Sequence, residues 1–406
     1  MTKRNQGRIK FMYKKIIIDA KKAANAIFRH PWIFSGAIVS KDFDLKHGSL
    51  VQVEDPNGRL LGVGTYSAAS SIAVRLLSFS EATIDKNWFI DQLRKADEKR
   101  RLFGFGSKGE TTGYRVAFGE VDGLPGLIVD RFDEVFVFQI ATAGMDALRT
   151  EIVEAIKEVF APRTIYERSD LPSRREEELA DEVGLRFGEE INQVEFKENG
   201  MKFLAEVANG QKTGFFLDQR DTRTAIRKLA KGRKILNIFS YTGAAAVAAL
   251  LGGATSILNI DSSDKALASI ADNAKLNKIS TKKFSTEQAD AFTWLSARNE
   301  PEYDMVIVDP PALIKSRHDL EEGKKAYHFV NRAAMRLVKN GGIFVTSSCS
   351  HYLTEEDLAF TLRRASVQNN LNLSLLQVIR QPSDHPFSVY FPEAAYLKTF
   401  VCRVGR

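Results

Sequence analysis

The chain has 406 residues, of which 44% are hydrophobic and 27% charged, with 27 glycines and 11 prolines. This composition excludes a disordered, collagenous or low-complexity chain and predicts two or three globular domains. Two cysteines are too few for a disulfide framework, and no apolar run is long enough to cross a bilayer, so we expect a cytoplasmic protein with no membrane partner.

Positive charge is concentrated at the N-terminal end of the chain. The whole chain carries a net charge of +7, and residues 1–80 hold 13 Lys and Arg against 5 Asp and Glu. A basic first segment on a near-neutral body favours a polyanionic partner, with nucleic acid as the first candidate. A solvated basic arm without a partner is the alternative that charge alone leaves open.

Residues 1–80 combine short β-like segments with turn signals, of which Asp55-Pro56-Asn57-Gly58 is the clearest. We expect strands at 49–53, 60–66 and 72–77. The segment is therefore predicted to form a small β-rich domain.

Residues 81–190 are predicted to form an α+β domain that begins with a helical connector. A charged amphipathic helix is expected over 85–103, and apolar residues recur at helical spacing over 145–159. The charged run 174–178 predicts a loop or hinge over 170–182. Strands are expected at 114–120, 127–130 and 135–140.

Residues 191–406 begin with two expected strands, 194–198 and 202–207, and then alternate regularly between strands and helix-length segments. This alternation predicts a doubly wound α/β sheet with a Rossmann-like topology. The expected strand cores are 234–239, 256–260, 284–288, 303–308, 342–347, 372–379 and 396–404.

Candidate ligand residues follow the first three strands of this sheet. A dinucleotide fingerprint needs several glycines, whereas the first loop has only Gly243, so NAD is disfavoured. Asp261 ends the second strand, and Asp290 and Ala291 follow the third. The set fits a nucleoside without phosphates, such as S-adenosylmethionine (SAM), although Asp261 alone would suit a helix N-cap. The first loop consists of Phe239, Ser240, Tyr241, Thr242 and Gly243.

The fourth strand ends in Asp309, Pro310 and Pro311. Both prolines lack an N–H and have a fixed φ, so they form a rigid wall whose carbonyl groups can accept hydrogen bonds from an amino group. We assign Pro310 and Pro311 to substrate binding, and Asp309 to both the cofactor and the substrate. Taken alone, these residues would also suit a proline-terminated strand with a solvated acid.

The fifth strand ends at Cys349, next to the strand that carries Asp309. A thiolate that adds to C6 of a cytosine makes C5 nucleophilic enough to take a methyl group, so Cys349 and Asp309 are the candidate catalytic residues. The site is expected to lower the thiol pKa or to deprotonate the thiol on binding, and to raise the pKa of Asp309. A buried cysteine is otherwise a small hydrophobic residue, as we interpret Cys402.

Together these residues carry a family resemblance. The chain resembles the bacterial class I SAM-dependent methyltransferases that modify C5 of cytosine in 23S ribosomal RNA and carry an N-terminal PUA domain. The matching segments follow the order of the family along almost the whole chain. They are His30–Phe34, Gly210–Arg220, Phe239–Gly243, Asp309–Pro311, Ser347–Ser350, Asp384–Pro386 and Tyr396–Lys398.

The resemblance implies an RNA-binding PUA-like domain, a seven-stranded sheet whose last strand is antiparallel, and large-subunit rRNA as the partner. It implies that SAM lies over 239–243, Asp261 and Asp290, and that Cys349 is the nucleophile. Many relatives have a second cysteine directly after the two prolines, where this chain has Ala312. The base that removes the C5 proton therefore stays open.

Two alternatives are kept. A methyltransferase acting on guanine would need no thiol, because a guanine nitrogen can attack SAM directly. A non-catalytic RNA-binding factor of ribosome assembly would keep the fold without the reaction. No catalytic metal is expected, since the histidines show no ligand spacing, and a homodimer is left open.

Overall fold

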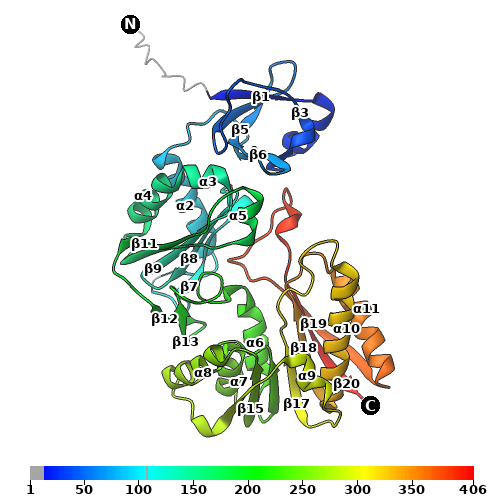
Figure 1. The fold of residues 1–406 in the computed structure, drawn as a ribbon. Coiled ribbons are helices and arrows are strands. Elements are labelled where there is room, and N and C mark those ends of the chain that lie inside the picture. The colour runs from blue at the N-terminus through cyan, green and yellow to red at the C-terminus, as the bar shows by residue number, and fades with distance from the viewer. Residues whose placement is uncertain (1–12, 107) are drawn as a thin grey trace.

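The computed structural model describes residues 13–106 and 108–406. Three large sheets follow one another along the chain, and Figure 1 shows the N-terminal sheet at the top and the C-terminal sheet at the bottom. The first twelve residues, which carry part of the N-terminal basic charge, lie outside the described residues. Within the described ranges, no helix is both long and apolar enough to cross a membrane.

The first sheet has six strands in the order β2-β6-β5-β4-β1-β3. Alternate residues such as Ile16 and Ile18, or Val51 and Val53, are fully buried, as expected for strands with one face on a core. The three expected strands are present as β4, β5 and β6. The elements are β1 (Lys14–Ile18), α1 (Ala24–Ile27), β2 (Trp32–Phe34), β3 (Ile38–Lys41), β4 (Leu50–Glu54), β5 (Leu60–Tyr66) and β6 (Ile72–Ser78).

The second sheet has five strands in the order β11-β10-β9-β8-β7, and α2 and α4 pack together beside it. Apolar residues of both helices, including Phe89, Leu93 and Ile152, are fully buried there. The elements are α2 (Lys86–Arg101), β7 (Gly113–Phe118), β8 (Leu127–Phe132), β9 (Val135–Ile140), α3 (Ala143–Ala147), α4 (Arg149–Phe160), β10 (Thr164–Ser169), α5 (Pro172–Glu176) and β11 (Glu182–Gly188).

Two expectations for this region need correction. The helical pattern over 145–159 is interrupted at Leu148, where α3 ends and α4 begins. The segment expected to be a loop over 170–182 contains α5, and β11 starts at its last residue. The charged sequence hid both elements, because β11 is a largely exposed edge strand without a buried face.

A two-stranded hairpin, β12 (Gln193–Glu198) and β13 (Met201–Glu206), links the second sheet to the C-terminal sheet. Phe196 and Phe203 from the hairpin pack in one cluster with Phe132 of β8, Phe215 and Val247. Phe215 and Val247 belong to the C-terminal part of the chain. The second sheet and the C-terminal part therefore share a hydrophobic core.

The C-terminal sheet has seven strands in the order β16-β15-β14-β17-β18-β20-β19, and β20 runs antiparallel to both of its neighbours. This confirms the predicted SAM-methyltransferase fold. Its strands are β14 (Lys234–Ile238), β15 (Ser256–Asp261), β16 (Phe284–Gln288), β17 (Tyr303–Val308), β18 (Val338–Ser348), β19 (Asn372–Arg380) and β20 (Lys398–Gly405). Its helices are α6 (Arg220–Leu229), α7 (Ala244–Leu251), α8 (Asp264–Leu276), α9 (Ala291–Ser296), α10 (Leu320–Arg336) and α11 (Glu355–Gln368).

Helices cover both faces of this sheet. Leu236 and Val306 point to the core formed with α9, α10 and α11, whereas Ile235 and Met305 point to the core formed with α6 and α7. The strand order reverses between β14 and β17, which is where ligands bind in sheets of this type. The loops after β14 and β17 therefore meet at one edge.

Candidate active site

The loop after β14 has an irregular backbone. Phe239, Tyr241 and Gly243 all have positive φ angles, of 61°, 46° and 73°. Non-glycine residues in this region are strained and concentrate at functional sites. The Tyr241 N–H donates to the Asp261 carboxylate over 2.8 Å, which ties this loop to the end of β15.

A cavity of about 420 Å³ opens at this edge of the sheet, within the roughly 300–1,000 Å³ typical of small-molecule sites. Two of the sequence candidates are not on its wall. Gly243 packs against Ile270, which a side chain at that position would hit, and Ala291 is buried at the start of α9. The cavity is lined by the remaining candidates, namely Phe239, Ser240, Tyr241, Thr242, Asp261, Asp290, Asp309, Pro310, Pro311 and Cys349.

The opposite wall comes from the segment before α6, for which sequence reasoning assigned no roles. The segment lies in the matching stretch Gly210–Arg220, so the resemblance pointed to it without showing which side chains face the cavity. These side chains include Lys212, Asp218 and Gln219 from that segment, together with Thr222 and Arg223 from the first turn of α6.

Asp309 is held from this wall. The Gln219 side-chain amide donates to both carboxylate oxygens of Asp309, over 2.8 and 2.9 Å. Burial, together with the nearby charge of Asp218, raises the pKa of Asp309 to about 7. The carboxyl is thus poised to exchange a proton near neutral pH, as the sequence analysis expected.

Asp218 forms a second buried carboxylate beside Asp309. It accepts hydrogen bonds from the Lys212 ammonium over 2.9 Å and from the Tyr396 hydroxyl over 2.7 Å. Burial alone would raise the pKa of Asp218, but Lys212 and these hydrogen bonds hold it well below its usual range. Asp218 therefore stays ionised and disfavours a second negative charge on Asp309.

Cys349 follows the end of β18 and lines the cavity, with its side chain partly buried. Burial and the neighbouring Asp309 raise the pKa of the thiol to about 11. The thiol is therefore protonated in the protein alone at neutral pH, so of the two expected routes, a lowered pKa and deprotonation on binding, deprotonation on binding is the one that the raised pKa leaves. Cys402, at 1% exposure, lies in the core as expected.

A buried lysine supports the turn after Cys349. The Lys398 ammonium donates to the backbone oxygen of Ser350 over 2.8 Å and also to that of Leu353. Burial lowers the pKa of Lys398 to about 8. Lys398 therefore fixes the backbone next to Cys349, and the positive charge of its ammonium group lies close to the thiol.

Comparison with known proteins identifies the family. Residues 174–399 match the family model of S-adenosylmethionine-dependent methyltransferases, and residues 16–79 match that of a PUA-like domain. The chain belongs to the S-adenosylmethionine-dependent methyltransferases. The methyltransferase is 33% identical over 397 residues to ribosomal RNA large subunit methyltransferase I of Shigella boydii, covering 97% of this chain and all of the relative. The corresponding protein of Salmonella typhimurium is 34% identical over 396 residues, covering 97% and 98%.

Solved structures share the fold of this methyltransferase over nearly its full length. SMU.776, described as a methyltransferase and solved with S-adenosylhomocysteine (SAH), superposes with a TM-score of 0.82 at 22% identity, covering 96% of this chain and 99% of the other. A second structure, described as a SAM-dependent methyltransferase from Streptococcus mutans, gives a TM-score of 0.81 at 23% identity, with the same coverage.

The cavity of the methyltransferase has unused polar groups that suit its cofactor, SAM. The hydroxyl oxygens of Ser240 and Thr242 are buried and have no hydrogen-bond partner, although both residues line the cavity. Asp261 accepts bonds from the N–H groups of Tyr241 and Ser263, and its carboxylate has lone pairs left for hydroxyl donors. The N-cap of α8 is Ser263, so Asp261 is not used as that cap.

Asp290, unlike Asp261, uses its carboxylate to cap a helix. The Asp290 carboxylate is the N-cap of α9 and accepts bonds from the N–H and hydroxyl of Thr293, both over 2.8 Å. These bonds lower the pKa of Asp290. Asp290 therefore shapes the cavity wall, and its neighbour Phe292 adds an aromatic surface there that sequence reasoning missed.

Proposed function

We propose that this methyltransferase transfers a methyl group to C5 of a cytosine in 23S ribosomal RNA through a covalent adduct at Cys349. The observation that carries the proposal is the placement of Cys349 and Asp309 on neighbouring strands, in the cavity whose other end suits SAM. The names of the relatives support large-subunit rRNA as the substrate.

SAM supplies an electrophilic methyl group on a sulfonium. The Cys349 thiolate adds to C6 while Asp309 donates its proton to N3, so C5 gains the electron density of an enamine. C5 then takes the methyl group of SAM, which would leave as SAH. Loss of the C5 proton to a base expels the thiolate, and N3 returns its proton to Asp309, which restores the ring. Pro310 and Pro311 form the wall against which the target base rests, and the bidentate bond from Gln219 orients Asp309.

The proposal assigns a role to each of the three parts of the chain. Residues 1–80 form the PUA-like RNA-binding domain, residues 81–190 the α+β middle domain, and residues 191–406 the domain that transfers the methyl group.

The pH dependence of kcat/KM tests the pairing of the two catalytic groups. The reactive enzyme holds one proton between Cys349 and Asp309, because sulfur attacks as a thiolate while the acid is protonated. With pKa values of about 7 and about 11, kcat/KM should rise as the pH increases through about 7 and fall again near 11. An Asp309→Asn variant should lose the rise near pH 7 and gain activity only as the thiol ionises at higher pH, whereas a rise that stays near pH 7 in this variant would contradict the pairing.

Base identity is tested by incubating the protein with 23S rRNA transcript and isotopically labelled SAM, followed by nuclease digestion and mass spectrometry. We expect the label in 5-methylcytidine. Label in a methylated guanosine would favour the alternative without a thiol nucleophile. Binding of rRNA without binding of SAH, measured by calorimetry, would favour a non-catalytic assembly factor.

A further inference from the structure

The connection between β19 and β20, residues 381–397, joins the catalytic edge to the N-terminal sheet. Its base lies beside Cys349, because Arg380 pairs with Lys398 and Lys398 pairs in turn with Ser348. Figure 1 shows this orange-red segment rising from the C-terminal sheet and ending beneath β6 of the N-terminal sheet.

The connection is held firmly at its base. The buried Asp384 carboxylate binds the Arg220 guanidinium over 2.6 and 3.0 Å and the Arg115 backbone N–H over 2.9 Å. The Gln381 side chain closes the two ends, since it donates to the Ala394 oxygen over 2.7 Å and accepts from the Tyr396 N–H over 3.1 Å.

The upper end of the connection packs on the N-terminal sheet through aromatic rings. Phe391 lies 4.9 Å from the Trp32 ring, centroid to centroid, and Glu393 lies 3.4 Å from the His30 imidazole. Trp32 also lies 6.5 Å from Phe34 on the same strand. Rings from two distant parts of the chain therefore lie next to one another.

Other apolar side chains of this region face solvent. Phe387 is 51% exposed, Val389 90% and Tyr390 50%, and Phe34 at the other end is 46% exposed. The tip that carries them is ordered by a bridge between Ser388 and Phe391. Within residues 13–106 and 108–406, neither the Phe387 ring nor the Tyr390 ring packs against another aromatic ring. We call the exposed rings of Phe34, Tyr390 and Phe387, together with the partly buried Trp32 and the buried Phe391, the aromatic row.

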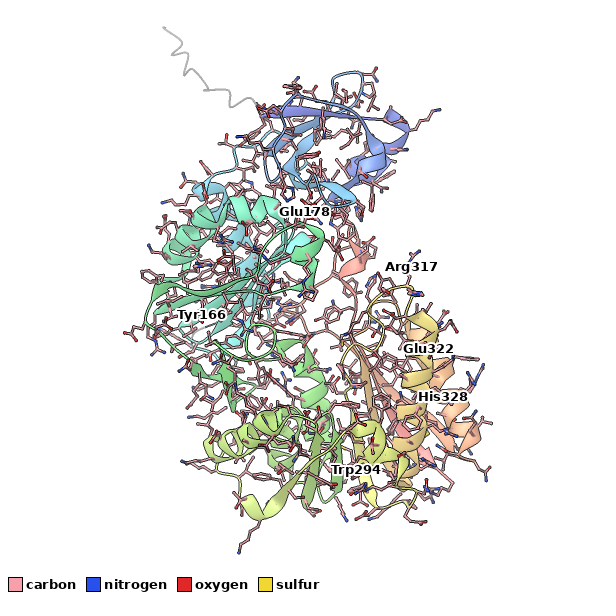
Figure 2. The ribbon with its side chains drawn as sticks, in the orientation of Figure 1. Tyr166, Glu178, Trp294, Arg317, Glu322 and His328 are labelled. Atoms are coloured by element: carbon pink, nitrogen blue, oxygen red, sulfur yellow. The ribbon has the colours of Figure 1, made fainter. Side chains whose placement is uncertain are left out.

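Space lies beside the aromatic row, but positive charge for a nucleotide chain lies outside that space, because Arg75 and three acids, Glu120, Glu176 and Glu177, line it. A second cavity, of about 250 Å³, is bordered by Trp32, Phe118 and Phe391. Arg317 is exposed on the loop between β17 and α10, which rises on the same side of the C-terminal sheet (Figure 2). The N-terminal domain that carries Trp32 and Phe34 also has an excess of Lys and Arg.

We propose that the aromatic row is a stacking platform for the single-stranded RNA that adjoins the target cytosine. The inference rests on the proposed function, because a base must leave its helix to reach Cys349 and its unstacked neighbours then need new surfaces. Aromatic rings provide such surfaces for any base sequence. The ordered tip presents Tyr390 and Phe387 without a cost of folding on binding.

The test compares RNA binding by a Phe387→Ala/Tyr390→Ala double variant with binding by the wild type. The probe is a short fluorescent single-stranded RNA of mixed sequence, and a 23S rRNA transcript serves as a second probe. Loss of one stacking ring weakens binding by about 5- to 150-fold, so we expect Kd to rise at least fivefold. The variant with Phe387→Trp and Tyr390→Phe, which keeps both rings, should bind within about twofold of the wild type.

Phe360→Ala is the matched control, because Phe360 is also 50% exposed but lies on α11. This control should leave RNA binding unchanged, and all variants should bind SAH as the wild type does. Equal RNA affinity of the double variant and the wild type would overturn the platform. An equal loss of RNA affinity in the Phe360→Ala control would also overturn the platform. So would the finding that the wild type self-associates, that the double variant does not, and that this difference accounts for the loss of RNA affinity.

The platform and the proposed function can fail separately. If the wild type methylates 23S rRNA and the double variant binds RNA equally well, only the platform is wrong. If the wild type forms no 5-methylcytidine, the proposed function is wrong, whatever the double variant does.

Discussion

A Cys349→Ala variant is expected to bind SAH with wild-type affinity and to form no 5-methylcytidine. Without the thiol, C5 of cytosine has no enamine character, and loss of a covalent nucleophile costs on the order of 10⁶-fold in kcat in a well-studied hydrolase. SAH binding should persist because the orphaned hydroxyls of Ser240 and Thr242 are unchanged. Calorimetry with SAH and transfer of labelled methyl to 23S rRNA measure the two properties.

Cys402→Ala is the control for this experiment. Cys402 is the other cysteine of the chain and lies in the core, so its replacement should cost some stability but leave methyl transfer in place. RNA containing 5-fluorocytosine should form a covalent complex with the wild type and not with Cys349→Ala, because the adduct has no C5 proton to lose. Undiminished methylation of 23S rRNA by the Cys349→Ala variant would contradict the covalent mechanism.

An Asp384→Ala variant is expected to lose about 3–5 kcal/mol of unfolding free energy, the range for breaking a buried ion pair on one side. Asp384 is fully buried and satisfies the Arg220 guanidinium together with the Arg115 N–H. Burial alone would raise the pKa of Asp384, but Arg220 holds it far below its usual range, so the group is ionised in the folded protein. Removing it leaves the Arg220 guanidinium with a hydrogen bond to the Gly113 oxygen and, as its nearest remaining carboxylate, Glu198 at 3.6 Å.

Chemical denaturation followed by fluorescence measures this effect. Glu322→Ala is the control, since Glu322 forms an exposed pair with Lys325 at the protein surface (Figure 2) and such pairs contribute about 0–1 kcal/mol. Similar unfolding midpoints for Asp384→Ala and Glu322→Ala would show that the buried cluster does not stabilise the fold.

Much of the site could be predicted because parallel strands bring their carboxyl ends to one edge. Asp261, Asp309 and Cys349 each follow a strand of the C-terminal sheet, so their place along the chain already indicated one shared site. The same reasoning did not show that Gly243 and Ala291 would lie off the cavity wall. Each follows a strand, but packing turns Gly243 towards Ile270 and buries Ala291.

The rest depended on contacts between distant residues. Tyr396 reaches Asp218 across 178 positions of sequence, and no local pattern reveals such a bond. For the same reason, the sequence could not decide between a lowered thiol pKa and deprotonation of the thiol on binding. The sequence placed Cys349 beside an acid but did not show how deeply both would be buried.

The hydrophobic cluster around Phe196 and Phe203 determines how the enzyme can move. Because that cluster spans the second sheet, the hairpin and the start of the C-terminal domain, opening these parts like a clamp would expose its apolar side chains to water. The N-terminal sheet is also packed on the second sheet, because Val63 of β5 and Leu77 of β6 lie in one cluster with Phe89 of α2, and the Arg75–Glu177 ion pair spans the same junction. Packed clusters at both junctions therefore oppose hinge motion between the sheets, so a ribosomal particle has to fit the surface that the three sheets present together.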